Sequence, residues 1–103
     1  MNENEVNGIH QYVRNDQKTP IGVLAAVEVE GRVGIAASMC NPKDHFDPKL
    51  GVLKARCRAE ANAKNGKNRK LPFKVANSPV VTQFKIRAEK FFKDKEIVLD
   101  FEE

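Results

Sequence analysis

The chain has 103 residues, of which 41% are hydrophobic and 31% charged, and its formal net charge is +4. This balance predicts a single globular domain with a small core and excludes a chain that is disordered throughout. No apolar run approaches the about 20 residues of a membrane-spanning helix, and the acidic, polar start is unlike a signal peptide. We therefore expect a cytoplasmic protein without membrane association, in which Cys40 and Cys57 are thiols.

The first half of the chain predicts three strands joined by short turns. The strands are expected at residues 8–14, 21–30 and 32–40, after a flexible lead-in over 1–7. The alternation from Val27 to Glu30 is the period of a strand with one wet face. Gly31 supplies the positive φ that a tight hairpin turn needs. Three strands with such short connections form an antiparallel meander.

Many residues of these strands are small, and small residues let another backbone come close. Two interpretations are open: a helix packs tightly on the sheet, or a ligand or second subunit lies against it. The small residues are Gly22, Ala25, Ala26, Gly34, Ala36 and Ala37.

Two helices are predicted by their capping residues. Asp47-Pro48 is an N-cap followed by proline at the first helical position, and Gly66 supplies a stop after about Asn65. Ser78-Pro79 starts the second helix in the same way. The expected apolar stripe of the first helix is Leu50, Leu53, Cys57 and Ala61. That of the second is Val80, Val81, Phe84, Ala88, Phe91 and Phe92.

The fold class predicted from these elements is α+β. We expect a three-stranded antiparallel sheet with both helices packed on one face, forming a single domain over residues 8–95. Residues 96–103 are an acidic tail in which Ile97, Leu99 and Phe101 alternate, which indicates a possible short terminal strand or an arm on a neighbour. Dimerisation through the sheet edge or the phenylalanine-rich second helix is also expected.

Positive charge is concentrated between Lys49 and Lys95. This segment holds 14 of the 18 Lys and Arg residues and three acids, a formal charge of +11. Such a region predicts an anionic partner, namely nucleic acid, a phosphorylated ligand or an acidic protein surface. The alternative is that these residues are only the solvated faces of two helices. We expect phosphate contacts from Lys54, Arg58, Lys67, Arg69 and Lys70, and next from Lys85 and Arg87.

An exposed basic loop is predicted between the two helices, over residues 67–74. Phe73 in this loop either stacks on a base or plugs the core. The acidic tail, in turn, is able to fold back and mask the basic segment.

One interpretation of the segment before the first helix is a metal site, because Cys40, Asp44, His45 and Asp47 lie close in sequence. The spacing matches no known site, and the alternative is a turn in which Asp47 caps the helix and Phe46 packs beside it. Catalysis has little support, since neither cysteine has a predicted base and no phosphate-binding glycine loop follows a strand. We expect no enzyme activity, no metal and no cofactor.

One stretch of the chain resembles small bacteriophage-encoded proteins. Its strand ends in Ser38-Met39-Cys40-Asn41, and Pro42-Lys43-Asp44-His45-Phe46 precedes a helix rich in Ala and Arg. The resemblance covers about residues 10–60 and implies a phage or mobile-element origin, for proteins mostly of unknown function.

The order of elements is also similar to the core of double-stranded RNA-binding domains and of some integrase DNA-binding domains. In this chain no helix is predicted before the first strand, and Asp47-Pro48-Lys49 stands where those domains have paired lysines. The leading hypothesis is a phage-type protein whose basic surface binds nucleic acid. The alternative is a phage inhibitor or sequestering protein that binds an acidic host protein or a nucleotide signal.

Overall fold

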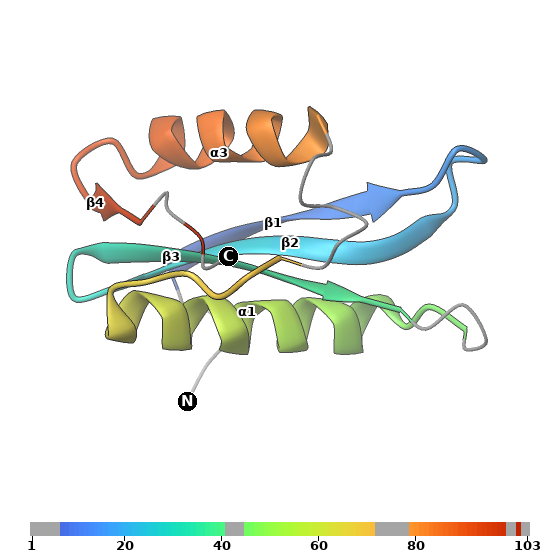
Figure 1. The fold of residues 1–103 in the computed structure, drawn as a ribbon, viewed down its shortest axis with the longest axis horizontal. Coiled ribbons are helices and arrows are strands. Elements are labelled where there is room, and N and C mark those ends of the chain that lie inside the picture. The colour runs from blue at the N-terminus through green and yellow to red at the C-terminus, as the bar shows by residue number, and fades with distance from the viewer. Residues whose placement is uncertain (1–6, 41–44, 72–78, 99–100, 102–103) are drawn as a thin grey trace.

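The protein folds into a four-stranded sheet with one helix on each face (Figure 1). The computed structural model describes residues 7–40, 45–71, 79–98 and 101. Its elements are β1 (Asn7–Arg14), β2 (Pro20–Val29), β3 (Arg32–Met39), α1 (Pro48–Asn65), α3 (Pro79–Phe91) and β4 (Glu96–Ile97). The strand order is β1-β2-β3-β4, with β4 parallel to β3 and the other pairs antiparallel. The α+β class, the meander and the terminal strand are confirmed.

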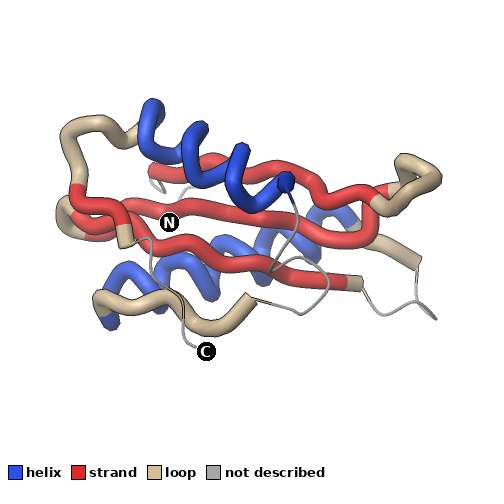
Figure 2. Tube along the Cα trace, turned by 45° about the horizontal axis from the view of Figure 1, so that its top comes forward, coloured by secondary structure: helices blue, strands red, loops and turns tan. Residues whose placement is uncertain are grey.

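The prediction that both helices share one face of the sheet is wrong. Alternate residues of β2 enter two separate cores: Leu24 packs with Phe84 of α3, and Val23 packs with Ala55 of α1. Figure 2 shows the two helices on opposite sides of the strands. The sequence carries the reason, because the run from Val23 to Val27 is continuously apolar and its side chains are buried on both faces.

Helix α1 has the predicted ends but not the predicted buried face. The Asp47 carboxylate accepts a hydrogen bond from the Leu50 amide at 3.2 Å, and Gly66 ends the helix with φ of 74°. The buried positions are the small ones: Gly51, Ala55, Ala59 and Ala63. The expected stripe instead faces outward, with Leu50 45% and Leu53 59% exposed, and Cys57 and Ala61 exposed as well.

The close approach of α1 to β3 explains why the small face is buried. A Cβ atom at Gly34 would overlap the Ala59 carbonyl oxygen and the Ala63 amide nitrogen, both backbone atoms of α1. Larger side chains on this helix face would hold the helix away from the sheet, whereas alanine and glycine allow contact. The interpretation that a helix packs tightly on the small-residue strands is therefore confirmed.

Helix α3 covers the other face with larger side chains. Val81, Phe84 and Ala88 of this helix are buried, as is Phe92 just after it. Four of the six predicted stripe residues are thus buried, and Val80 is partly buried against the same core. Phe91 is 54% exposed, so its assignment to the buried stripe is wrong. The predicted cap Ser78 lies outside the described residues.

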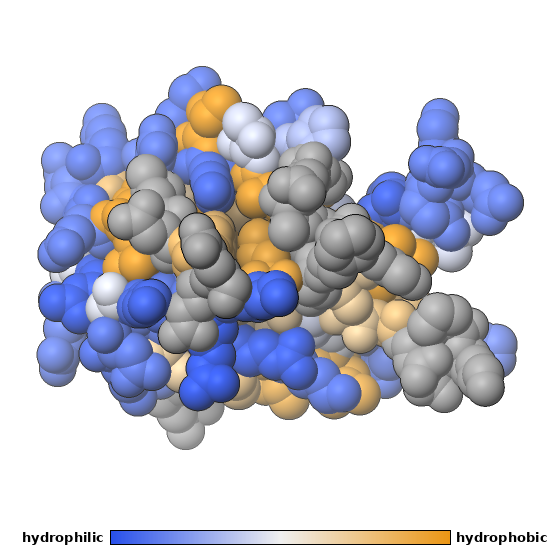
Figure 3. Space-filling view, viewed as in Figure 1, coloured by the Kyte–Doolittle hydropathy of each residue, from blue (hydrophilic) through white to orange (hydrophobic). Residues whose placement is uncertain are grey.

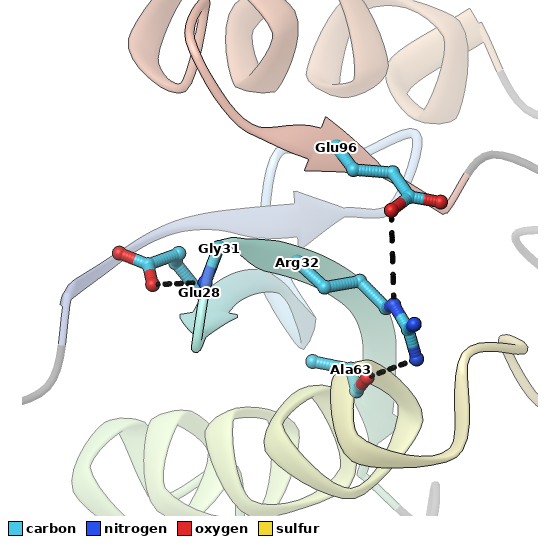
Figure 4. Close-up of polar contacts among 5 residues, drawn as sticks. All are labelled: Glu28, Gly31, Arg32, Ala63 and Glu96. Carbon is cyan, nitrogen blue, oxygen red and sulfur yellow. Dashed lines mark hydrogen bonds and ion pairs between the residues drawn. The ribbon is translucent and has the colours of Figure 1, made fainter.

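Just after the hairpin between β2 and β3, Arg32 contacts both the end of α1 and β4. Glu30 and Gly31 have positive φ values of 51° and 87°, as the twist of a tight hairpin requires. The Glu28 carboxylate accepts from the Gly31 amide at 2.9 Å, which lowers the pKa of Glu28 (Figure 4). Arg32 reaches the Ala63 carbonyl at 3.4 Å, and its Nε lies 4.0 Å from the Glu96 carboxylate.

None of the described helices is long and apolar enough to cross a membrane.

Candidate nucleic-acid interface

The outer edge of β3 is closed by other parts of the chain. At its start, the Glu96 amide donates to the Gly31 carbonyl at 3.0 Å and the Val98 amide to the Val33 carbonyl at 2.9 Å. Beyond β4, side chains replace the missing strand. An open edge would offer its amides and carbonyls to another chain, so this closure prevents strand pairing here.

Two buried asparagines satisfy both backbone groups of Ile35. Asn68 Oδ1 accepts from the Ile35 amide at 2.9 Å, and Asn62 Nδ2 donates to the Ile35 carbonyl at 2.8 Å. Asn68 also donates to the Val98 carbonyl, so it joins β3 to the segment after β4. Because both asparagines are at most 2% exposed, their hydrogen bonds fix the 67–71 segment against the sheet edge.

Arg58 bonds the next outward carbonyl along β3, that of Ala37. Its Nη1 donates to the Ala37 carbonyl at 3.0 Å. That bond uses one of the five N–H groups of a guanidinium, so the remaining donors stay available. The rest of the side chain is exposed. Arg58 is therefore held in place by the sheet while it presents positive charge to solvent.

Beside this edge lies a hollow of about 470 Å³ between α1 and the segment that follows it, which we name the basic hollow. Three cationic side chains line it, and none of the described residues that line it is acidic. Its floor includes small and apolar residues. Its lining includes Ala36, Ala37, Arg58, Arg69, Lys70 and Leu71. Figure 3, in the view of Figure 1, shows hydrophilic residues across the lower centre of this face, with hydrophobic residues both above and beneath them.

The structure brings together some of the predicted phosphate contacts and separates others. Arg58, Arg69 and Lys70 share the basic hollow. Lys54 lies one helical turn before Arg58 and lines the next hollow, toward the end of β3. Lys67 is exposed in the segment that ends with Arg69 and Lys70.

The two predicted contacts on α3 lie elsewhere. The Lys85 ammonium lies 4.8 Å from the centre of the Phe101 ring, and Phe101 pairs with Asn68 in an isolated bridge. Lys85 is thus connected to the 67–71 segment through Phe101. Arg87 instead reaches β1, at the opposite edge of the sheet, where its Nη1 donates to the His10 carbonyl at 3.2 Å. A single surface does not hold all seven residues.

Two described residues before α1 have the positions that we expected for a turn that orients the helix. Asp47 caps the helix, and Phe46 packs between Tyr12 and Gly51. Within the described ranges, no group of three His, Cys, Asp or Glu side chains is placed to hold a metal ion. Asp44 and the loop residue Phe73 lie outside the described residues.

Two features of the site were missed in the sequence. Asn62 and Asn68 were not singled out, although an asparagine at a buried helical position signals a hydrogen bond to another backbone. The contact of Arg56 Nη2 with His10 Nδ1, at 3.5 Å, joins residues 46 positions apart and has no local signal.

Comparisons with known proteins give no match to a family model, to a curated protein or to a solved structure. The resemblance to small phage proteins therefore stays a prediction.

Proposed function

We propose that this protein is a small, non-enzymatic, phage-type binding protein that engages nucleic acid through the basic hollow. The observation that carries the proposal is the convergence of Arg58, Arg69 and Lys70 on one hollow, in which no acid stands among the lining residues that the structure describes. Lys54 and Lys67 extend the positive surface on either side. The neighbouring acid Glu60 is paired with Lys64 at 3.1 Å, which leaves the cations of the hollow without a carboxylate partner among the described residues.

The composition of the hollow suits a nucleotide better than a free ion. Guanidinium groups bind phosphate oxygens in bidentate fashion, so Arg58 and Arg69 are suited to the backbone. Ala36, Ala37 and Leu71 give an apolar floor on which a sugar or base can lie. Sites for single strands also combine a cationic groove with apolar contact to the bases, although there the contact is stacking on aromatic side chains.

Salt dependence tests this proposal directly. Each phosphate that a cation neutralises releases condensed counterions, so binding of a fluorescent oligonucleotide should weaken steeply between 50 and 200 mM salt, by about 10²-fold or more. Fluorescence polarisation on random single-stranded and duplex oligonucleotides gives both the affinity and the slope.

Charge reversal at the exposed residues Lys67, Arg69 and Lys70 should remove most of the binding. The matched control reverses three other exposed lysines, Lys90, Lys93 and Lys95, which lie at and beyond the end of α3. Both triple variants change the net charge equally, so a non-specific charge effect would weaken both alike. Absence of binding by the unaltered protein at low salt, or equal losses in the two variants, would refute the proposal.

A second candidate is the inhibitor or sequestering protein that binds a host protein. Leu50 and Leu53 favour it, because two large apolar side chains are exposed on the outer face of α1. A protein target would bind with a shallower salt dependence, and Leu53→Ser would weaken it while leaving oligonucleotide binding unchanged. A pull-down from host lysate with the unaltered protein and this variant distinguishes the two candidates.

A further inference from the structure

The edge of the sheet opposite to the basic hollow is formed by β1. In the described part of the chain, β1 has β2 on one side and no strand on the other. The His10 carbonyl points outward, since it accepts from Arg87 and not from β2. In an antiparallel pair, the backbone N–H and C=O groups that point away from the partner strand belong to alternate residues. The backbone groups of Gly8 and Tyr12 therefore point outward, like those of His10. This edge offers a template for an added strand.

Two arginines reach the middle of this edge from opposite faces of the sheet. Arg56 of α1 places Nη2 3.5 Å from His10 Nδ1, on one face. Arg87 of α3 places Nη1 3.2 Å from the His10 carbonyl and 3.4 Å from Gln11 Oε1, on the other face. Burial together with the charges of Arg56 and Arg87 lowers the pKa of His10, so the imidazole adds little charge of its own.

Within the part of the chain that the structure describes, neither arginine has an acidic partner. The two ion pairs of the described residues are Arg32–Glu96 and Lys64–Glu60. Arg56 Nε is buried and has no hydrogen-bond partner among those residues, although a buried guanidinium normally satisfies its donors. The contacts that Arg56 and Arg87 do make are to neutral acceptors. A carboxylate would supply the missing charge and acceptor.

We propose that the β1 edge binds an extended acidic segment of a partner protein by strand addition. The added backbone pairs with the outward groups of Gly8, His10 and Tyr12, and Arg87 leaves the His10 carbonyl to an amide of the added strand. Successive side chains of a strand point to opposite faces. Two consecutive acidic residues therefore place one carboxylate at Arg56 and the next at Arg87.

Charge decides among the possible occupants of this edge. A second copy paired through β1 would bring two sets of Arg56 and Arg87 together across a two-fold axis, and like charges across an interface are unfavourable. Nucleic acid would meet the arginines but has no amide to use the strand edge. An acidic peptide satisfies both the open backbone groups and the two cations.

Two fluorescent hexapeptides of equal composition test the proposal, each blocked at both ends. The first is Thr-Val-Glu-Glu-Val-Thr, and the second is Glu-Val-Thr-Thr-Val-Glu. We expect the first to bind about tenfold more tightly, because only its adjacent carboxylates reach both arginines. Backbone amide resonances of Gly8 and Tyr12 should shift on binding, whereas that of Ile35 at the closed edge should not.

The variant Arg56→Gln/Arg87→Gln should lose this preference and retain only weak binding of either peptide. The control Lys90→Gln/Lys93→Gln removes the same charge from exposed positions and should keep the preference. Circular dichroism establishes that both variants are folded. Equal affinities for the two peptides would overturn the proposal. So would concentration-dependent shifts at β1 without peptide, which indicate self-pairing, or shifts there with an oligonucleotide but not with the first peptide.

Discussion

The two edges of the sheet are built differently. At β3 the outward carbonyls of Gly31, Val33 and Ala37 and both backbone groups of Ile35 are bonded, by the amides of Glu96 and Val98 and by side chains of Asn62, Asn68 and Arg58. At β1 the recorded outer contact is a single, exposed hydrogen bond from Arg87 to the His10 carbonyl. Both edges carry cations, but those at β3 surround a hollow and those at β1 flank an open strand.

We propose that this difference lets a short chain keep two cationic surfaces for two kinds of partner. Closing one edge excludes strand pairing there, so that the cations beside it remain available to a ligand that needs no backbone contact. Leaving the other edge open adds backbone hydrogen bonds to the charge and so favours a peptide. The predictions that follow alter one edge at a time.

The largest expected effect comes from Gly34, which lets α1 approach β3. Gly34→Ala should destabilise the protein by about 3 kcal/mol, the upper end of the usual cost of overpacking, since the added methyl group overlaps backbone atoms that cannot move alone. Displacing α1 would also draw Asn62 and Arg58 away from the β3 edge. Urea denaturation measures the loss of stability.

Gly51→Ala is the matched control, because Gly51 lies on the same buried face of α1. A Cβ atom there would meet side chains, with Val23 Cγ2 at 3.1 Å and Phe46 Cε1 at 3.3 Å. The gain in helix propensity, about 1 kcal/mol, should offset this tight contact. A small effect of Gly34→Ala would mean that α1 does not depend on close approach.

The next effect should come from Asn68, which closes the β3 edge. Asn68→Ala leaves the Ile35 amide and the Val98 carbonyl without partners and should cost about 2–3 kcal/mol of stability. Hydrogen exchange of the Ile35 amide should accelerate more than that of amides in β2. Asn65→Ala, at an exposed position near the same segment, should cost less than about 0.5 kcal/mol.

The local structure was predictable from the sequence where a residue acts on its neighbours. Asp47 and Gly66 mark the ends of α1 because capping is decided within a few residues. Which side of α1 is buried depends instead on how closely it approaches β3. Hydrophobicity favoured the leucines, but Gly34 and the alanine face require the opposite orientation.

The basic residues of the site could be identified from the sequence, but which of them share a surface could not. The basic residues of the 67–70 loop are identifiable in sequence because the loop is polar and interrupted by proline. That Arg58 joins them, whereas Arg87 turns to β1, depends on the helices occupying opposite faces. This placement follows from the burial of β2 on both faces, whereas we expected both helices on one face of the sheet.

The smallest expected effect is a pH dependence at the open edge. The folded state favours neutral His10, because burial and the two arginines hold its pKa below the usual value of 6.5. The unfolded chain therefore binds more protons as the pH falls through 6.5, so the contribution of His10 to stability is present above that pH and lost below it. The charged or titratable groups that face His10 are Arg56, Arg87 and Tyr12.

His10→Gln should remove this part of the pH dependence, as followed by thermal unfolding at pH 5 to 7.5. His45→Gln is the control, since His45 is the only other histidine and is exposed. If His10→Gln leaves the profile unchanged, then the two arginines do not act on this imidazole.

The most direct test of the basic hollow uses the thiol of Cys57, a residue of its lining. Cys57 is exposed and lines the hollow beside Arg58, and the second cysteine, Cys40, can be replaced by serine. The measurement is the rate at which a thiol reagent modifies Cys57 in Cys40→Ser, with and without a saturating oligonucleotide. We expect a severalfold slower rate of modification that recovers at high salt. An unchanged rate while the oligonucleotide is bound would contradict it.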